Sequence, residues 1–210
     1  GFQPDTLVFT KDQLRQRFSS FGGKIGVRNK TINAASISYN PSLSLGLFAD
    51  NHSGTETNFI LDAPLSKSFG KIFSFDLGLT ADITSFKSDT TTINNNLYYL
   101  TPAVNFKTPN FILKVGLRPS WDNQVFSMLP NFSAEAKIKD ERFILVAGWI
   151  GYFNKTTYEY LAGLNPWIQQ PQSLLNTRMS EQYAGFKGAA GSHFTYNAKV
   201  SFIKYNNQPL

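Results

Sequence analysis

The chain has 210 residues, a formal net charge of +6 and no cysteine, with 41% hydrophobic and 16% charged residues. This length suits one β-barrel or sandwich domain, or two small domains. The lack of cysteine excludes a disulfide framework, a thiolate nucleophile and a cysteine-ligated metal. No apolar run reaches about 18 residues, which excludes a helical membrane protein but not a barrel whose strands alternate apolar and polar residues.

The first third of the chain contains several segments in which apolar and polar residues alternate. Residues 6–10 and 16–28 each predict a strand, because successive side chains of a strand point to opposite faces. Residues 35–49 predict a longer strand, in which Pro41 favours a bulge or an edge position. Residues 58–65 predict the strand that returns after a turn.

The most regular alternation lies in residues 71–87. One parity is apolar, with Phe73, Phe75, Leu77, Leu79, Ala81 and Ile83. The other parity is polar, so this strand has one apolar and one polar face. Globular strands usually have about 5–6 residues, whereas a tilted strand that crosses a bilayer needs about 9–11.

The rest of the chain continues this pattern. Further strands are predicted at residues 97–107, 111–120, 131–139, 178–190 and 194–205. Residues 143–153 are apolar at both parities, so they are either a strand buried on both faces or a poorly assigned segment. About ten strands without a helical period predict an all-β fold, an antiparallel up-and-down barrel of about ten to twelve strands of the outer-membrane type.

The connections alternate between short and long. Residues 108–110 and 139–142 predict tight turns, whereas residues 88–96 and 155–177 predict long loops. Counting strands places both tight turns at one end of the barrel and both long loops at the other. Residues 121–130 are expected to connect two strands at the loop-bearing end.

Polar residues on the strands are expected to line the interior of the barrel. Asp76 and Asp82 share a face but lie about 20 Å apart along their strand, too far for a paired glycosidase mechanism. The alternative is the solvated face of a soluble sheet. The predicted lumen-lining residues are Asp76, Asp82, Lys114, Arg118, Glu135 and Lys137.

Aromatic and amide groups near the predicted long loops favour a binding site for a polar ligand. The predicted ligand-binding residues are Trp121, Asp122, Asn123, Trp167 and Gln169. The ligand is a small molecule or a glycan of unknown identity, and the alternative is that the long loop is merely mobile.

A platform that stacks on sugars is a further alternative for Trp121-Asp122-Asn123 and for Trp167 with Gln169-Gln170. Aromatic residues near strand ends favour an interfacial girdle or core packing in a soluble barrel. These residues are Tyr98, Tyr99, Trp121, Trp149, Tyr152 and Tyr158.

The sequence contains no motif for catalysis, metal binding or phosphate binding. His52 and His193 are read as solvated residues of turns, and H-E-x-x-H, G-x-S-x-G and Walker A sequences are absent. We therefore expect no enzymatic activity, no cofactor and no metal. The 20 basic residues are scattered singly, so we expect no nucleic-acid partner.

The C-terminal fifth carries a resemblance to a known family. It contains Asn165-Pro166, Leu175-Asn176-Thr177-Arg178, the sequence EQYAGFKG at 181–188 and FTYNAKVS at 194–201. These residues resemble the barrel strands of outer-membrane proteins of Gram-negative bacteria, in particular TonB-dependent receptors or receptor-like barrels. The resemblance implies a location in the cell outer membrane, contact with outer-membrane lipid and a receptor or transport role.

A full receptor of this family is expected to have a plug and about 22 strands, whereas this chain predicts no plug and about half as many strands. We therefore expect residues 1–210 to form a single β-barrel domain that is part of a larger polypeptide. An energy-coupling periplasmic protein would then act through parts outside this chain.

These observations favour an outer-membrane barrel that serves as a receptor or transport scaffold for a small ligand and resembles a TonB-dependent receptor. The alternative is a soluble β-barrel or sandwich at the cell surface that binds glycan or lipid.

Overall fold

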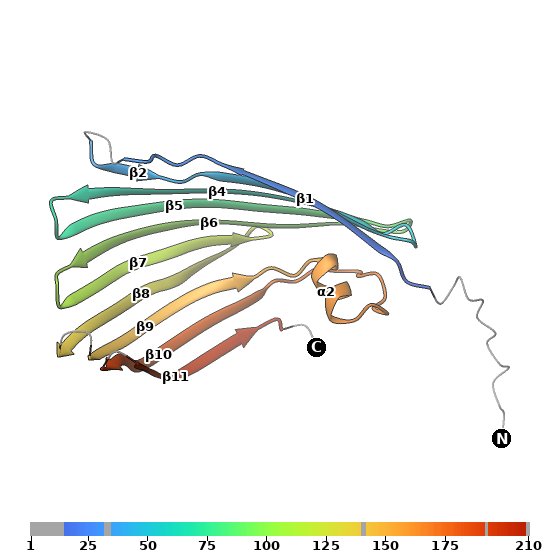
Figure 1. The fold of residues 1–210 in the computed structure, drawn as a ribbon. Coiled ribbons are helices and arrows are strands. Elements are labelled where there is room, and N and C mark those ends of the chain that lie inside the picture. The colour runs from blue at the N-terminus through green and yellow to red at the C-terminus, as the bar shows by residue number, and fades with distance from the viewer. Residues whose placement is uncertain (1–14, 32–34, 140–141, 192, 209–210) are drawn as a thin grey trace, which may run out of the picture.

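The computed structural model describes residues 15–31, 35–139, 142–191 and 193–208. The strand predicted at residues 6–10 lies outside them. The described residues form an antiparallel sheet of 11 strands (Figure 1). The strands are β1 (Phe18–Gly26), β2 (Ile37–Tyr39), β3 (Ser42–Asp50), β4 (Thr55–Phe69), β5 (Phe73–Lys87), β6 (Thr92–Lys107), β7 (Phe111–Asp122), β8 (Val125–Lys139), β9 (Phe143–Asn154), β10 (Thr177–Ala190) and β11 (Phe194–Asn206). A helix, α2 (Tyr158–Leu164), lies between β9 and β10.

The sheet has an up-and-down topology. Its strand order is β1-β3-β4-β5-β6-β7-β8-β9-β10-β11, with β2 paired to β4. The predicted all-β, antiparallel up-and-down fold is confirmed, and 11 strands lie within the predicted range. The sheet curves into an open trough (Figure 1), and among the described residues the edge strands β1 and β11 each pair with one neighbour.

The two ends of the trough differ in their connections. At the turn end, the tight turn before Phe111 lies beside the connection after Lys139, because Phe111 pairs with Ala136 on β8. The backbone N–H of Lys137 donates to Asn110 there, at 2.8 Å. The strand ends that flank the predicted turn at residues 139–142 therefore lie at the same end as the turn at residues 108–110, as predicted, while residues 140–141 lie outside the described residues. The opposite, loop end carries residues 51–54, 88–91, 123–124 and 155–176.

Pro41 divides the strand that was predicted over residues 35–49. The structure has β2 before it and β3 after it, and both pair with β4. Pro41 has no N–H for the ladder, but its carbonyl accepts a hydrogen bond from Val27 at 2.9 Å. The register with β4 is the same on both sides of the proline, whereas the pairing with β1 begins only at Ser42, so Pro41 lies where the outer ladder ends.

Two predicted connections are shorter than expected. β6 begins at Thr92, so the polar loop predicted over residues 88–96 is wrong for its second half. The predicted 121–130 connection is wrong too, because β7 and β8 meet at Asn123-Gln124, which have φ angles of 46° and 77°. Positive φ at both central residues is typical of a two-residue hairpin turn.

The uncertain segment 143–153 is a strand. β9 pairs with β8 on one side and with β10 on the other, which places it inside the sheet. It is not buried on both faces, because Leu145 and Trp149 on its convex parity are 43% and 47% exposed.

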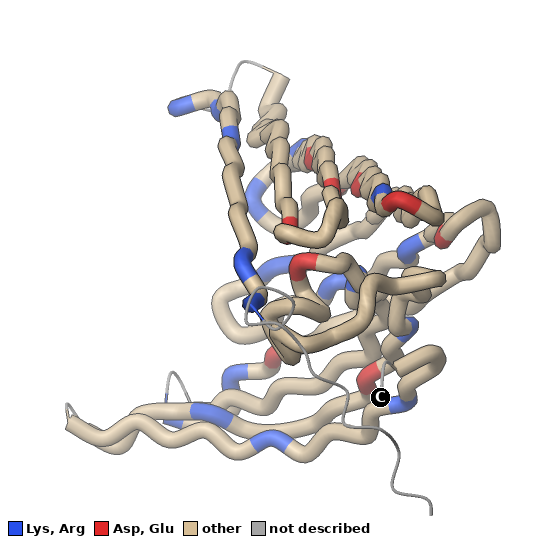
Figure 2. Tube along the Cα trace, turned by 90° about the vertical axis from the view of Figure 1, so that its right-hand side faces the viewer, with Lys and Arg blue, Asp and Glu red and all other residues tan. Residues whose placement is uncertain are grey.

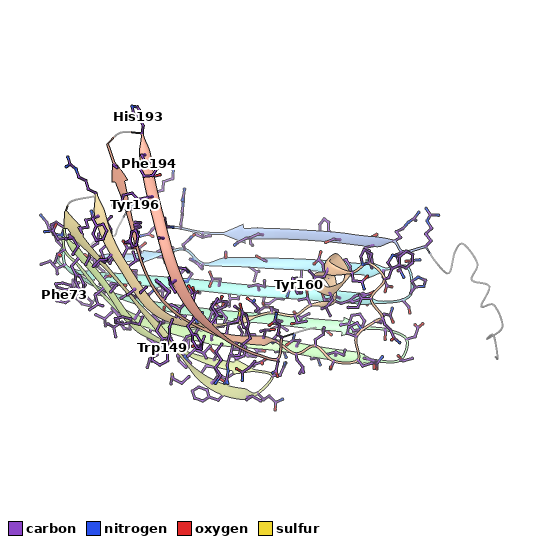
Figure 3. The ribbon with its side chains drawn as sticks, turned by 90° about the horizontal axis from the view of Figure 1, so that it is seen from below. Phe73, Trp149, Tyr160, His193, Phe194 and Tyr196 are labelled. Atoms are coloured by element: carbon purple, nitrogen blue, oxygen red, sulfur yellow. The ribbon has the colours of Figure 1, made fainter. Side chains whose placement is uncertain are left out.

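The two faces of the sheet are unlike each other. The convex face carries the apolar parity of most strands, and Phe73 and Trp149 lie on it (Figure 3). Phe73 and Val200 on this face are 51% and 81% exposed, whereas the polar Thr84 and Asn95 on the concave face are fully buried. Polar side chains are thus inside and large apolar side chains outside, the reverse of a soluble sheet.

The buried apolar core lies at the loop end, between α2 and the concave face, and residues of both contribute to it. Its members are Phe48, Phe86, Tyr158, Ala162 and Leu174.

Candidate functional site

The concave face holds all six residues that were predicted to line a lumen. Asp76 and Asp82 lie on the polar parity of β5, and the other four lie on the concave parity of β7 and β8. The two aspartates are at different heights in the trough. This placement agrees with the prediction, while a lumen-lining role stays a prediction.

Several of these charged groups have partners on the same face. Asp76 accepts hydrogen bonds from Ser66 at 2.7 Å and from Asn105 at 2.8 Å. Together with Lys114, Asp76 lines a cavity of about 380 Å³ near the turn end. The Lys187 Nζ lies 2.9 Å from Glu135 Oε1. Polar side chains of different strands therefore contact one another on the concave face.

Arg118 lies near the middle of this face and is largely buried. Its guanidinium donates to the carbonyl of Gly151 at 2.9 Å and lies 5.4 Å from the centre of the Tyr99 ring. These two contacts hold the guanidinium against the concave face of the sheet.

At the loop end, residues 155–176, which we call the α2 segment, fold onto the concave face. The ring of Tyr158 packs against Phe48 and Phe86, with centroid distances of 5.6 and 4.9 Å. Both phenylalanines lie on the concave side of β3 and β5. A buried aromatic cluster of this kind fixes the segment against the wall.

The start of α2 is capped from two directions. The Thr157 hydroxyl accepts from the Tyr160 N–H at 3.0 Å, a normal helix N-cap. The Glu56 carboxylate on β4 accepts from the N–H groups of Tyr158 at 2.6 Å and Glu159 at 3.2 Å. A negative group at a helix N-terminus is favourable, so β4 of the sheet supplies part of the cap. This helix lies within residues 155–177, which were predicted to form a long loop.

Tyr158 and Asp50 form a second link between the α2 segment and the wall. The Tyr158 hydroxyl donates to Asp50 at 2.6 Å. Burial, followed by this hydrogen bond, raises the pKa of Tyr158. The phenol therefore stays protonated and remains a donor.

The first residue of the α2 segment forms an ion pair with the wall. The Lys155 Nζ lies 2.9 Å from Asp82 Oδ1, and both side chains are mostly buried. Burial lowers the pKa of Lys155, and Asp82 opposes that shift. One predicted lumen residue, Asp82, thus anchors the α2 segment.

A chain of buried amides holds the far end of the segment. Asn176 donates to Asn95 on β6 at 2.7 Å and to Asp122 at 2.7 Å, and Asn123 donates to Asn95 at 2.9 Å. Asn95 also donates to the carbonyl of Thr156 at 2.9 Å. Sequence reasoning missed Asn95 and Asn176, because an asparagine-rich stretch favours a loop. The signal available was their location beside predicted strand ends.

A cavity of about 420 Å³ opens between the α2 segment and the connection after β3. Trp167 and Gln169 lie along it, as do Asp50, His52 and Tyr158. Gln170 crosses it, donating to Asp50 at 3.0 Å and to the His52 carbonyl at 2.7 Å. An aromatic ring with several amide groups suits a polar ligand.

The five residues predicted to bind ligand do not lie together. Trp167 and Gln169 share the 420 Å³ cavity, whereas Asp122 and Asn123 belong to the amide chain. Trp121 lies on the convex face, where its ring is 5.3 Å from Phe126. Neighbouring residues of a strand point to opposite faces, so Trp121 and Asp122 are separated by the sheet. Ligand contact by any of them stays a prediction.

The six aromatic residues predicted near strand ends are also divided between the faces. Tyr98, Trp121 and Trp149 lie on the convex face and are partly exposed. Tyr99 and Tyr152 lie on the concave parity. Tyr158 belongs to the α2 segment and is buried against the concave face, so a girdle role is wrong for it.

The described residues include no group of three histidine, aspartate or glutamate side chains arranged to hold a metal. His52 lies at the loop end and His193 beside the β10–β11 turn at the other end (Figure 3). Among the residues with described placement, no helix has the length and apolar content required to cross a membrane.

Comparisons with known proteins inform the fold. No protein-family model matches the chain, and no curated protein matches its sequence. Its structure is similar to that of the siderophore receptor PirA from Pseudomonas aeruginosa, with a TM-score of 0.68 and 12% sequence identity. The match covers 90% of this chain and 39% of the receptor chain, so this chain spans about two-fifths of that protein. At this identity the likeness concerns the fold alone.

Proposed function

We propose that this chain forms part of the wall of an outer-membrane barrel that serves as a receptor or transport scaffold for a small ligand, in the manner of TonB-dependent receptors. The observation that carries this proposal is the inverted polarity of the sheet. The convex face is apolar and exposed, whereas the concave face is polar and holds most of the buried side chains. A soluble sandwich would instead bury its apolar faces against each other.

The dimensions of the convex face fit a bilayer. Its apolar run on β5 extends from Phe73 to Ile83. Such a run is about 33 Å long at about 3.3 Å per residue, and a tilt of about 40° reduces its height to about 25 Å, the height of the apolar band of membrane barrels. Aromatic rings lie near both limits, with Phe73 and Phe106 5.2 Å apart at the turn end and Trp121 beside Phe126 at the loop end.

The edge strands β1 and β11 would each need a pairing partner in a membrane. In hydrocarbon an unpaired strand edge leaves N–H and C=O groups without partners, so only closed sheets are stable there. Our proposal therefore includes further strands that pair with β1 and β11. An energy-coupling periplasmic partner is also part of it, through regions outside this chain.

The ligand would approach at the loop end. The cavity beside Trp167 and Gln169 supports this placement, because it combines an aromatic ring with amide groups. The role is binding and passage without catalysis, which agrees with the separation of His52 and His193 at opposite ends of the sheet.

The three tryptophans provide a direct test. Variants that keep one tryptophan each, with the other two replaced by phenylalanine, are reconstituted in bilayers whose acyl chains carry bromine, a short-range quencher. Trp121 and Trp149 on the convex face should be quenched strongly, whereas Trp167 in the α2 segment should not. Equal quenching of all three, or strong quenching of Trp167 alone, would contradict a lipid-facing convex surface.

A further inference from the structure

A group of exposed basic side chains lies at the turn end, beside β2, β4, β5 and β6. Its members, which we call the basic rim, are Arg28, Lys30, Lys67, Lys71 and Lys107. We propose that the basic rim binds the phosphates of anionic phospholipid headgroups. This inference rests on the proposed function, since it requires the convex face to lie in a membrane.

Hydrogen bonds gather the members of the basic rim from distant parts of the chain. The Asn29 amide donates to the carbonyls of Thr31 at 3.0 Å and Ile37 at 2.9 Å, which holds Arg28 and Lys30 beside β2. Ile37 in turn pairs with Lys67 on β4.

The other two members come from adjacent turns. Lys71 lies in the β4–β5 turn, and the backbone N–H of Lys107 donates to the carbonyl of Ile72 in that turn at 2.8 Å. The basic rim is thus built from three successive connections at one end of the sheet.

Lys67 indicates where the headgroups would lie. It shares the convex parity of β4 with Leu65 and Phe69, and its Nζ lies 5.4 Å from the centre of the Phe69 ring. A lysine on a lipid-facing surface keeps its ammonium at the headgroup level while its methylene chain contacts apolar groups. Phe69, Ile72 and Phe73 beside it are large, apolar and exposed. Such a mixture of cations and aromatic rings is typical of a membrane interface.

The charge of the basic rim is not balanced by nearby acids among the described residues. Asp76, a nearby carboxylate, lies on the concave face and already accepts bonds from Ser66 and Asn105. The loop end, which faces the viewer in Figure 2, is different, because acidic and basic residues are interspersed there. Its acids include Asp82, Asp122 and Glu159.

The chemistry of the ligand follows from this arrangement. Lysine and arginine supply donors only and bind phosphate oxygens well. Each basic group near an anionic bilayer surface strengthens binding about fivefold. A headgroup phosphate joined to acyl chains would contact the basic rim and the adjacent apolar convex face at once, which free phosphate cannot do.

The test compares two triple variants of equal net charge. One is Lys67→Gln, Lys71→Gln and Lys107→Gln in the basic rim. The matched control is Arg17→Gln, Lys87→Gln and Lys204→Gln, which are exposed residues outside the basic rim. Each protein is reconstituted in bilayers with equal amounts of phosphatidylglycerol and phosphatidylcholine, and native mass spectrometry measures the ratio of the two lipids that stay bound.

The wild type and the control should retain phosphatidylglycerol preferentially. In the basic-rim variant the ratio of bound phosphatidylglycerol to phosphatidylcholine should be at least about tenfold lower. No preference in the wild type, or equal losses in both variants, would overturn the inference. Flotation with vesicles of phosphatidylcholine alone separates the two proposals. These measurements use the barrel closed by its further strands. A wild-type barrel that does not float contradicts the membrane wall itself, whereas one that floats without lipid preference contradicts only the basic rim.

Discussion

The convex face and the loop end of the concave face stabilise the protein in opposite ways. The convex face presents large apolar side chains that contact few other residues, so its free energy depends on the surrounding solvent. The concave face at the loop end is a packed interior, in which Tyr158 and Asn95 have specific partners. The comparison shows that polarity alone does not locate the core of this molecule. The effect of a substitution on the convex face should therefore depend on whether lipid or water surrounds it. The effect of a substitution on the concave face should depend on the packing and hydrogen bonds of that side chain.

Replacement of Tyr158 by alanine should have the largest effect. Removing a buried aromatic ring usually costs about 3–5 kcal/mol, and Tyr158 also supplies the hydrogen bond to Asp50. We expect the α2 segment to detach while the sheet remains folded. Hydrogen exchange measured by mass spectrometry should become faster in residues 155–176 and stay unchanged in β7 to β9.

Tyr160→Ala is the matched control for that change. Tyr160 belongs to the same helix but is half exposed, so its loss should change stability by less than about 0.5 kcal/mol. Detachment of the segment by both substitutions would mean that the concave core is not specific.

On the convex face, Leu79→Arg should destabilise the protein only in a bilayer. An arginine on the lipid side near the midplane costs about 2–4 kcal/mol. Ser133→Arg, on the concave parity of β8, should cost less than about 1 kcal/mol. Urea unfolding in lipid vesicles measures both values. Equal costs for the two variants would reject the assignment of the faces.

The buried amide chain predicts an intermediate effect. Asn95→Ala removes the hydrogen bonds of the Asn95 side chain to Asn176, Asn123 and the Thr156 carbonyl, which should cost about 1–3 kcal/mol. Asn94→Ala, on the opposite and exposed side of β6, should be almost neutral. Thermal unfolding of both variants provides the comparison, and a neutral Asn95→Ala would show that the amides contribute nothing to the core.

The smallest effect concerns a single hydrogen bond on the convex face. The Trp149 indole N–H donates to the Ser180 hydroxyl at 3.0 Å. Trp149→Phe and Ser180→Ala should each cost about 0.5–1.5 kcal/mol, and the double variant should cost no more than the larger of the two. Additive costs in a double-mutant cycle would mean that this bond does not form in the membrane.

Much of the fold was predictable because apolar and polar residues alternate regularly along β5 and its neighbours. This alternation can be recognised within each strand without knowledge of the contacts it makes. The prediction was wrong where a local feature had two readings. Pro41 was compatible with a bulge or an edge position, and the structure has it where the ladder with β1 ends, with the register to β4 unchanged. Helix α2 has only seven residues, which is too short for a helical period, although Thr157 followed by Glu159 is a normal helix start.

The site was less predictable, because its contacts join residues that are far apart in sequence. Asp82 was correctly placed on the concave face, but its pairing with Lys155 depends on how the α2 segment folds back. Grouping Trp121 with Asp122 overlooked that neighbours in a strand face opposite sides. Glu56 gave no signal, since a buried polar residue looks the same in sequence as an exposed one, and Asn95 was assigned to a loop.

The up-and-down pairing of the strands also determines the order in which the molecule can form. Most strand pairs join sequence neighbours, so each hairpin closes a short loop, and such local contacts form quickly. The contacts of the α2 segment are of another kind, because Tyr158 and Asp50 are 108 residues apart and Glu56 and Tyr158 are 102 apart. The intervening strands must be in place before these partners can meet. A nascent chain should therefore pass through a stage with an assembled sheet and an undocked α2 segment, when the concave face at the loop end is still open.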